Sequence, residues 1–232
     1  MQNQRIITTG AEASVSSFVS RVFLWMAGGL MVTTLASFWV LAQPGLLAQI
    51  ISNKWLFFGL VLAELGLVVW LSAAIMSLSA AMATSLFLAY SFLNGITLSP
   101  LVYIYTSVSI ATTFAVSAGT FFFFALYGLT TKKDLTSLGG LLMMGLIGVI
   151  LASLVNILLK STGLYWVLTF VGVAIFMGLV AYDTQKLKNM HAMGFDHPEM
   201  ERKMVIMGAL ALYLDFINLF IMLLRIFGKR RD

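Results

Sequence analysis

The chain has 232 residues, of which 60% are apolar and 10% are charged, and its formal net charge at pH 7 is +5. An average soluble domain carries about 25% charged residues, so most of this chain cannot face water, and the composition predicts an integral membrane protein. Nucleic-acid binding is not expected, because the lysines and arginines lie at the ends of apolar runs rather than along one stripe. Since the chain has no cysteine, disulfides, thiolate metal sites and thiol nucleophiles are excluded.

Several apolar runs are long enough to cross a membrane, which takes about 20 residues of helix. Seven are predicted, and in chain order they cover residues 22–42, 55–76, 80–99, 107–129, 138–159, 164–182 and 204–227. Pro100 is expected to bend or end the third run, because proline lacks a backbone donor. The predicted fold class is therefore an all-α membrane protein. Its seven-transmembrane-helix bundle forms one domain, residues 21–232, after a polar N-terminal tail, residues 1–20.

The basic residues predict which side of the membrane each loop faces. With the N-terminus in the cytoplasm, Lys54 and Lys160 fall on the outer loops, and eight basic residues fall inside: Arg5, Arg21, Lys132, Lys133, Lys186, Lys188, Arg202 and Lys203. This bias predicts a cytoplasmic N-terminus. The basic residues at 229–231 oppose it if the last run crosses fully, as its length indicates, whereas a re-entrant last run would keep them inside.

Small and polar residues gather on one face in two of the runs. In the fifth run these are Gly145, Gly148, Ala152 and Asn156. In the third run they are Thr84, Ser91 and Asn94, with Thr97 one turn further on. Lipid gives helices no hydrophobic reason to associate, so such faces are typical of close packing and interhelical hydrogen bonds, with the lining of a pore as the alternative.

The last run holds one carboxylate, Asp215, within the stretch ALYLDFINLFIMLLRIFGKRR. Spacings of three and four place six small, polar or charged residues on one helical face: Gly208, Ala211, Asp215, Asn218, Met222 and Arg225. We expect this face to turn inward, away from lipid. A buried ionised carboxylate without a partner is costly, so Asp215 must pair, bind a cation or stay protonated, and it is a candidate functional residue.

Three other acidic residues could meet Asp215. Asp183 closes the sixth run, and the alternative for it is an ion pair at the membrane interface with Lys186, one turn away. Glu64 lies in the middle of the second run, where the alternative is a neutral, hydrogen-bonded glutamic acid. Asp134 lies in TTKKDL and is expected to be a solvated turn residue.

Two carboxylates brought close together share one proton, so the pair titrates as a unit and can sense pH. Asp183, Asp215 and Asn218 would also offer oxygen ligands to calcium, though fewer than the six to eight that tight binding needs, which suits passage better than storage. By naive counting Asp215 lies about 11 residues, or roughly 16 Å, deeper than Asp183. Tilt, or a sixth helix that continues past Asp183, must close this gap. No resident cofactor is expected, and the loop with His191 and His197 has no spacing typical of a metal site.

Three long segments are specific enough to suggest a family. They are LNGITLSPLVYIYT at 93–106, AYDTQKLK at 181–188 and LYLDFINLFIMLLRIFG at 212–228. These segments closely resemble the Bax inhibitor family, also called the transmembrane BAX inhibitor motif family, and the likeness covers nearly the whole chain, as in a bacterial inner-membrane member. The resemblance implies a seven-helix bundle with the last helix central, and a pH-sensitive calcium leak. It also implies that Asp183 and Asp215 are the paired aspartates and that Glu64 matches the family's acidic residue in the second helix.

The chain departs from that family pattern at one place. Calcium-leak relatives carry a basic residue toward the end of the second helix that latches onto the aspartate pair, and VVWLSAAIMSLSAAM at 68–82 contains none. The leading hypothesis remains a calcium leak in the lipid bilayer of the inner membrane, with protons as a second ion and Asp183 and Asp215 as the gate.

Two other functions are weighed against the leak. The resemblance implies a regulatory alternative, since relatives associate with and modulate a membrane-bound, ATP-dependent protease, and an exposed N-terminal tail would suit such a grip. An intramembrane aspartyl protease also has YD in one helix and Asp in the next, but its second aspartate lies in Gly-x-Gly-Asp, whereas here the sequence is LYLD. No serine, zinc or cysteine protease motif is present, so we do not expect an enzyme.

Overall fold

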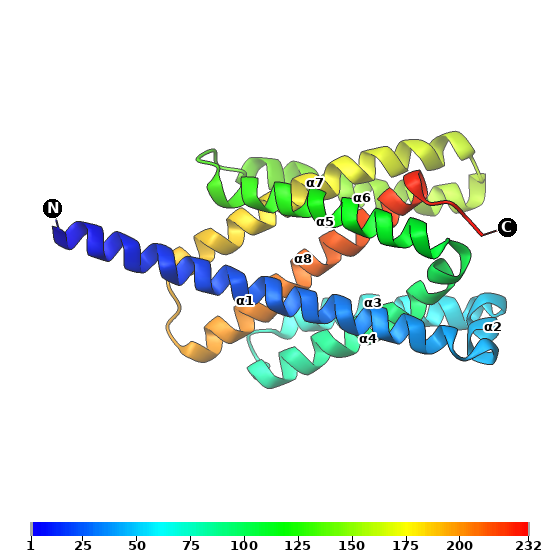
Figure 1. Ribbon diagram of the computed structural model, residues 1–232, viewed down its shortest axis with the longest axis horizontal. Coiled ribbons are helices and arrows are strands. Elements are labelled where there is room, and N and C mark those ends of the chain that lie inside the picture. The colour runs from blue at the N-terminus through cyan, green and yellow to red at the C-terminus, as the bar shows by residue number, and fades with distance from the viewer. Residues whose placement is uncertain (1, 232) are drawn as a thin grey trace. The chain divides into compact units, whose positions relative to one another are not determined.

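The computed structural model describes residues 2–231, with side chains from residue 15 onward. Within that range the chain forms eight helices and no strand: α1 (Gln2–Leu41), α2 (Pro44–Ser52), α3 (Lys54–Ala74), α4 (Ala80–Ile104), α5 (Ser107–Thr130), α6 (Thr136–Leu159), α7 (Thr162–Ala192) and α8 (Pro198–Phe227) (Figure 1). Seven of them, all except α2, are long and apolar enough to cross a membrane. The predicted all-α fold with seven spans is therefore confirmed.

Helix α2 was not predicted. Its nine residues, PGLLAQIIS, are too few to span the hydrocarbon core, and Pro44 and Gly45 suggested only a turn. Proline is nevertheless well suited to the first turn of a helix, where a backbone N–H has no intrahelical partner to lose. Leu47 and Ile50 of α2 are buried together with Val40 at the end of α1.

Pro100 was expected to bend or end the third span, and the second alternative is wrong, because α4 continues through Pro100 to Ile104. Proline at position 100 cannot donate to the carbonyl of Ile96, four residues earlier. The Ser99 hydroxyl donates to that carbonyl instead, at 2.7 Å, so the freed acceptor is satisfied. A helix inside a membrane tolerates proline when a neighbouring side chain replaces the lost hydrogen bond in this way.

Two other span boundaries differ from the prediction. Residues 2–20, within the predicted polar tail, are helical and continue without a break into the first span, because α1 runs from Gln2 to Leu41. Helix α7 runs on to Ala192, well past the predicted end at residue 182, and Asp183 therefore lies inside the helix. A sixth span that continues past Asp183 was one of the two ways predicted to bring the aspartates together.

The helices group into two compact units. Unit 1 comprises α1 to α4, His191–Tyr213 and the C-terminal residues, and unit 2 comprises Ser107–Met190 and Leu214–Arg230. In unit 1, α1 packs along α4 (Figure 1). A Cβ on Gly95 of α4 would overlap the Thr33 carbonyl oxygen of α1, and the Ser37 hydroxyl donates to the Gly95 carbonyl at 2.7 Å. Glycine is thus required for this close contact.

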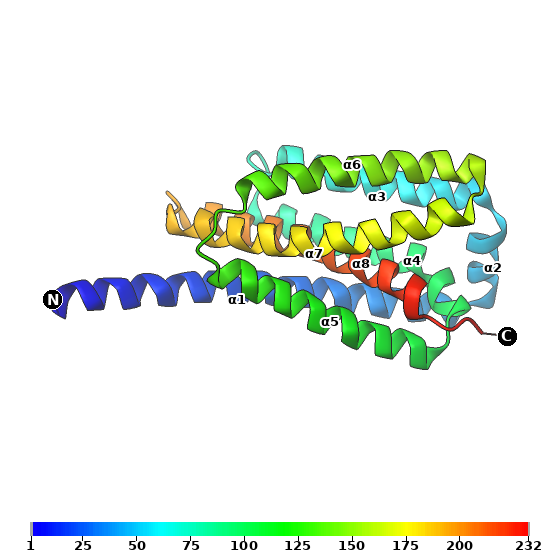
Figure 2. The ribbon, with the colours of Figure 1, turned by 90° about the horizontal axis from the view of Figure 1, so that it is seen from above.

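In unit 2, α6 runs alongside α7 (Figure 2), and glycines again permit the close approach. A Cβ on Gly178 would lie 2.7 Å from the Leu142 side chain, and one on Gly145 would lie 3.1 Å from Ile175. The predicted packing role of Gly148 is wrong, because a Cβ there would meet nothing within 4 Å. Val149 occupies the inward face instead, since the face of α6 advances by four residues after Gly145 rather than by three.

Helix α8 is the most enclosed of the spans. In its most apolar window 67% of the residues are buried, whereas the corresponding share in the other six spans is between 6% and 39%. Leu212, Leu219 and Leu224, which lie away from the predicted inward face, are fully buried as well. The prediction of one inward face was therefore too narrow, because α8 is covered by protein on several sides.

Candidate functional site

The central feature of unit 2 is a pair of carboxyl groups on its last two helices. Asp183 of α7 is half-buried, and Asp215 of α8 is only 5% exposed. Their side chains lie close enough to interact with each other. Two neighbouring carboxyl groups can share one proton, because the ionisation of the second is opposed by the charge of the first. The predicted meeting of Asp183 and Asp215 is thus present in the structure.

Apart from Asp183, Asp215 has few polar neighbours. Its Oδ2 atom is buried and receives no hydrogen bond from any described residue. The next residue, Phe216, packs edge-on against the rings of Phe114 and Phe121 of α5, with ring centroids 5.3 Å and 5.7 Å away. A carboxyl group as buried as that of Asp215 interacts strongly with a charge or proton that reaches it, because the dielectric constant inside the protein is low.

Asp183 is held in place by the residues around it on α7. A Cβ on Gly128 of α5 would overlap the carbonyl oxygen of Ala181, and one on Gly139 of α6 would overlap the ring of Tyr182. The Gln185 side chain accepts from the Leu135 N–H and donates to the Lys133 carbonyl, both at 2.8 Å. The two helices and the loop between them therefore fix α7 on either side of Asp183.

Lys186 is the cation associated with this pair. Its Nζ atom lies 5.9 Å from the centroid of the Tyr182 ring, and its charge also acts on Asp183. Asp183 thus has a cation within one helical turn, as the sequence suggested. Lys186 itself is exposed, so its charge is partly screened by solvent.

Glu64 belongs to unit 1 and has its own partners. The Thr97 hydroxyl donates to Oε1 at 2.6 Å, and the Asn94 amide donates to Oε2 at 3.2 Å. Both donors come from the polar face of α4, which confirms that this face forms interhelical hydrogen bonds. The arrangement matches the hydrogen-bonded alternative for Glu64.

The polar contacts of Glu64 continue through residues that the sequence did not single out. The Tyr213 hydroxyl donates to Asn94 Oδ1 at 3.0 Å and lies 2.5 Å from the Thr33 hydroxyl. The resulting network joins α1, α3, α4 and α8 within unit 1. Tyr213 stands two residues before Asp215, so its place in LYLD was the signal available in the sequence.

Asn218 is not part of the carboxyl pair. Its amide donates to the Leu214 carbonyl one turn back on α8, at 2.8 Å, and no described hydrogen bond joins it to either aspartate. Among residues 15–231, whose side chains the structure describes, no group of three or more His, Asp or Glu side chains is placed to hold a metal ion. The pair alone supplies at most four oxygens, whereas a tight calcium site has about six to eight.

A cavity with both polar and apolar walls lies near the C-terminal end of α8 in unit 2. It has a volume of about 280 Å³ and is lined by Ser153, Asn156, Ile157, Tyr165, Leu168 and Arg225. The Arg225 guanidinium lies 5.3 Å from the centroid of the Tyr165 ring, a cation–π contact that partly compensates its burial. Arg225 was placed on the inward face of the last helix by the sequence, and its partner Tyr165 was not predicted.

Seven apolar spans with a carboxyl pair between the last two helices define a polytopic α-helical membrane protein with an ionisable site inside the membrane segment. The chain belongs to the Bax inhibitor family, since the family described as "Inhibitor of apoptosis-promoting Bax1" matches residues 15–232. It is 49% identical over 221 residues to the inner membrane protein YbhL of Escherichia coli K12, which covers 95% of this chain and 94% of that protein.

More distant relatives also match over nearly their full length. A protein of Borreliella burgdorferi is 43% identical over 217 residues, covering 94% of each chain. A membrane protein of Streptococcus pyogenes serotype M1 is 33% identical over 229 residues, covering 98% of this chain and 99% of its own.

Proposed function

We propose that this protein is a cation leak pathway of the bacterial inner membrane, that calcium is its permeant ion, and that the proton shared by Asp183 and Asp215 gates it. The observation that supports this proposal is the close approach of the two carboxyl groups, one of them buried, on the last two spans. An ionisable residue inside a membrane segment is costly and typically marks a path for ions or protons.

Proton and calcium compete for the same oxygens. With a proton bound, the two carboxyl groups hold each other and do not present two charges to a cation. Without it, two neighbouring carboxylates repel each other and attract a divalent cation, which neutralises both. Calcium occupancy of the pair is therefore coupled to pH by thermodynamic linkage.

The small number of ligands suits an ion that passes through. Conduction requires a site that binds well enough for entry and weakly enough for release. Two carboxyl groups with no third acidic side chain among the described residues leave part of the calcium coordination to water. Such a site does not trap the ion.

The inner membrane is the proposed location because the similar Escherichia coli protein is named an inner membrane protein. The proposed orientation, with the N-terminus in the cytoplasm, rests on the eight basic residues that this orientation places inside. A cysteine introduced at exposed Lys160 and labelled from one side of intact cells tests that orientation.

A calcium-uptake assay tests the proposed activity. The purified protein is reconstituted into liposomes that contain a calcium-sensitive dye, and uptake is measured from about pH 5 to 9, the range that brackets a coupled acidic pair. We expect uptake above that of protein-free liposomes, and we expect it to change with pH. No uptake at any pH would contradict the leak.

Such a result would favour the second candidate, a regulatory protein that binds a membrane-anchored protease. One observation supports that role: α1 has 40 residues, Gln2–Leu41, whereas a membrane span needs about 20, so the helix extends beyond its span. Co-purification of the full-length protein with a membrane-anchored ATP-dependent protease, lost when residues 2–14 are deleted, is the corresponding test.

A further inference from the structure

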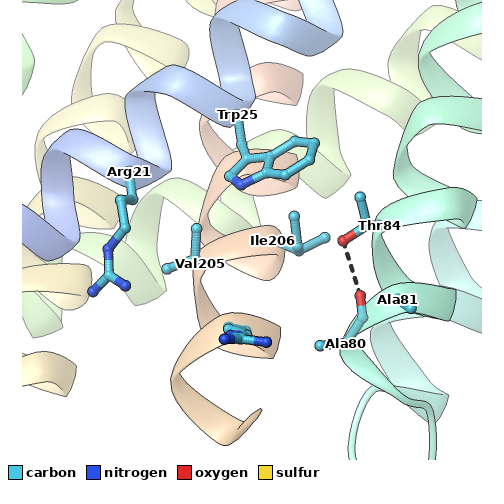
Figure 3. Close-up of a pocket in the computed structure, with 8 residues that line it drawn as sticks. Arg21, Trp25, Ala80, Ala81, Thr84, Val205 and Ile206 are labelled. Carbon is cyan, nitrogen blue, oxygen red and sulfur yellow. Dashed lines mark hydrogen bonds between the residues drawn. The ribbon is translucent and has the colours of Figure 1, made fainter. Parts of the chain in front are cut away.

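A second cavity, in unit 1, collects positive charge at one end of three spans. It has a volume of about 400 Å³ and is lined by Arg21, Trp25, Ala80, Ala81, Thr84, Arg202, Val205 and Ile206 (Figure 3). Its lining residues come from α1, α4 and α8. None of them takes part in the carboxyl pair or in the network around Glu64.

The two arginines of this cavity differ in whether they have a partner. Arg21 forms an ion pair with Glu201, whose Oε1 atom also lies 4.0 Å from His191 Nδ1. Arg202 is exposed, and no described ion pair or hydrogen bond engages its guanidinium. Arginine carries five N–H donors, so Arg21 keeps spare donors even while it is paired. The cavity thus offers one unneutralised cation and a second donor group.

The neighbouring charges do not cancel Arg202. Glu199 does not line the cavity, and its carboxylate accepts from the Ala80 N–H at 3.4 Å, at the start of α4. The ammonium of Lys203, which is 8% exposed, donates to the Met76 carbonyl at 3.1 Å. Glu201 is paired with Arg21 and Glu199 contacts the start of α4, so Arg202 is the arginine that a small anion would meet.

The remaining walls are apolar and lie where a lipid would reach them. Val205 and Ile206 are buried at the base of the cavity, and Figure 3 shows Ile206 between Trp25 and Thr84. Trp25 is 38% exposed at its rim. Tryptophan is enriched at the level of lipid head groups, where its ring meets apolar chains and its N–H meets polar groups.

The cavity also lies at a membrane boundary. Ala80, Ala81 and Thr84 lie in the first turns of α4, and Arg202, Val205 and Ile206 lie in the first turns of α8. Because successive spans alternate in direction, the starts of α4 and α8 fall on one side of the membrane, the side on which basic residues predominate. Basic pockets between spans on that side attract the head groups of anionic lipids.

We propose that this cavity binds the phosphate head group of an anionic phospholipid, with Arg202 as its main contact and Arg21 as a second donor. The glycerol and upper acyl chains would lie along Trp25 and Ala81. A volume of about 400 Å³ accommodates a head group of this size. The proposal is independent of the calcium leak and concerns a different part of the chain.

Lipid titration of the purified full-length protein in detergent tests the proposal, with native mass spectrometry and thermal unfolding as the two measurements. Phosphatidylglycerol is expected to bind and to raise the unfolding temperature more than phosphatidylcholine does. Arg202→Gln should weaken phosphatidylglycerol binding about tenfold or more, the loss expected for one charge-assisted hydrogen bond. Arg202→Lys should bind phosphatidylglycerol less tightly than wild type and more tightly than Arg202→Gln. Lysine keeps the positive charge but lacks the planar guanidinium group.

Two controls separate the site from general effects. Lys132→Gln removes an exposed basic residue outside the cavity and should leave lipid binding unchanged. Arg202→Gln without added lipid should unfold at the wild-type temperature, which shows that the fold is intact. Equal phosphatidylglycerol binding by Arg202→Gln and wild type would overturn the proposal. Equal stabilisation by phosphatidylcholine would overturn it too, and so would equal stabilisation by soluble glycerol phosphate, which would indicate a site for a free anion.

Discussion

Gly128 of α5 lies so close to Ala181 of α7 that a Cβ on the glycine would overlap the carbonyl oxygen of Ala181. Two residues further along α7 is Asp183. The position of this carboxyl group in unit 2 therefore depends on the absence of a side chain on a different helix.

The first prediction concerns this contact. Gly128→Ala should destabilise the protein by about 1 to 3 kcal/mol, because a backbone carbonyl cannot yield to the added methyl group as a flexible side chain could. Thermal unfolding in detergent measures the change. Gly140→Ala is the matched control, since a Cβ at Gly140 meets nothing within 4 Å. Similar unfolding temperatures for the two variants would show that α5 and α7 do not pack as described.

The second prediction concerns Ser99, whose hydroxyl satisfies the carbonyl that Pro100 leaves without a donor. Ser99→Ala should cost about 1 to 3 kcal/mol, the range for a buried polar group left unpaired. Unfolding in denaturant, compared with that of Ser85→Ala at an exposed position of the same helix, gives the difference. If the double variant Ser99→Ala, Pro100→Ala regains stability, the cost came from the missing hydrogen bond.

The third prediction concerns the network around Glu64. Tyr213→Phe removes the hydroxyl that lies between Thr33 and Asn94 and leaves Asn94 Oδ1 without that donor. We expect a loss of about 1 to 3 kcal/mol in the free energy of unfolding, because the group is fully buried. Tyr103→Phe, at an exposed tyrosine, should have almost no effect. If Tyr213→Phe were as stable as wild type, the hydrogen bonds of the Tyr213 hydroxyl would not stabilise the fold.

The fourth prediction concerns Asp134, in the turn between α5 and α6. The Thr136 hydroxyl and backbone N–H both donate to its carboxylate and hold the pKa of Asp134 below its ordinary value. Because the folded pKa is lowered, the resulting stabilisation is present above the ordinary carboxyl pKa and is lost as the pH falls through the lowered one. Thr136→Val should raise the pKa of Asp134, as measured by NMR titration of the carboxyl carbon. A pKa that does not move would show that the hydroxyl does not donate.

The number and order of spans could be predicted because a membrane demands long apolar helices, which are visible in composition alone. Helix α2 was missed because it is too short to give that signal. The end of α7 was placed too early because Asp183, Lys186 and Lys188 were interpreted as the edge of the membrane. Charge does not end a helix, and α7 stops only before Gly194, whose φ of +83° requires the left-handed conformation.

The site could be predicted only in part. Asp215 stood out because a carboxylate is costly among apolar residues, and Asp183 followed as its partner. The roles of Tyr213 and Thr33 could not be predicted, because their contact depends on how α1 and α8 cross, and helical periodicity does not fix that crossing. The same reason explains the error at Gly148: spacings of three and four both keep residues on one face, so only the neighbouring helix decides between positions 148 and 149.

The proposed gate predicts which carboxyl variants change the pH dependence of calcium uptake. Asp183→Asn should remove the pH dependence of calcium uptake, because one carboxyl group alone has no partner with which to share a proton. The double variant with Asp215→Asn should add little, since either change alone dissolves the pair. Asp134→Asn should leave the profile unchanged, because that carboxylate lies in an exposed turn.

The most direct test is calcium uptake by liposomes that contain the Asp215→Asn protein, measured beside wild type from about pH 5 to 9. The amide keeps the size of the side chain, and a neutral group is less costly to bury than an unpaired carboxylate, so the protein should still fold. Our account predicts that wild-type uptake changes with pH and that uptake by Asp215→Asn does not. Uptake by Asp215→Asn with the same pH dependence as wild type would contradict the proposed gate.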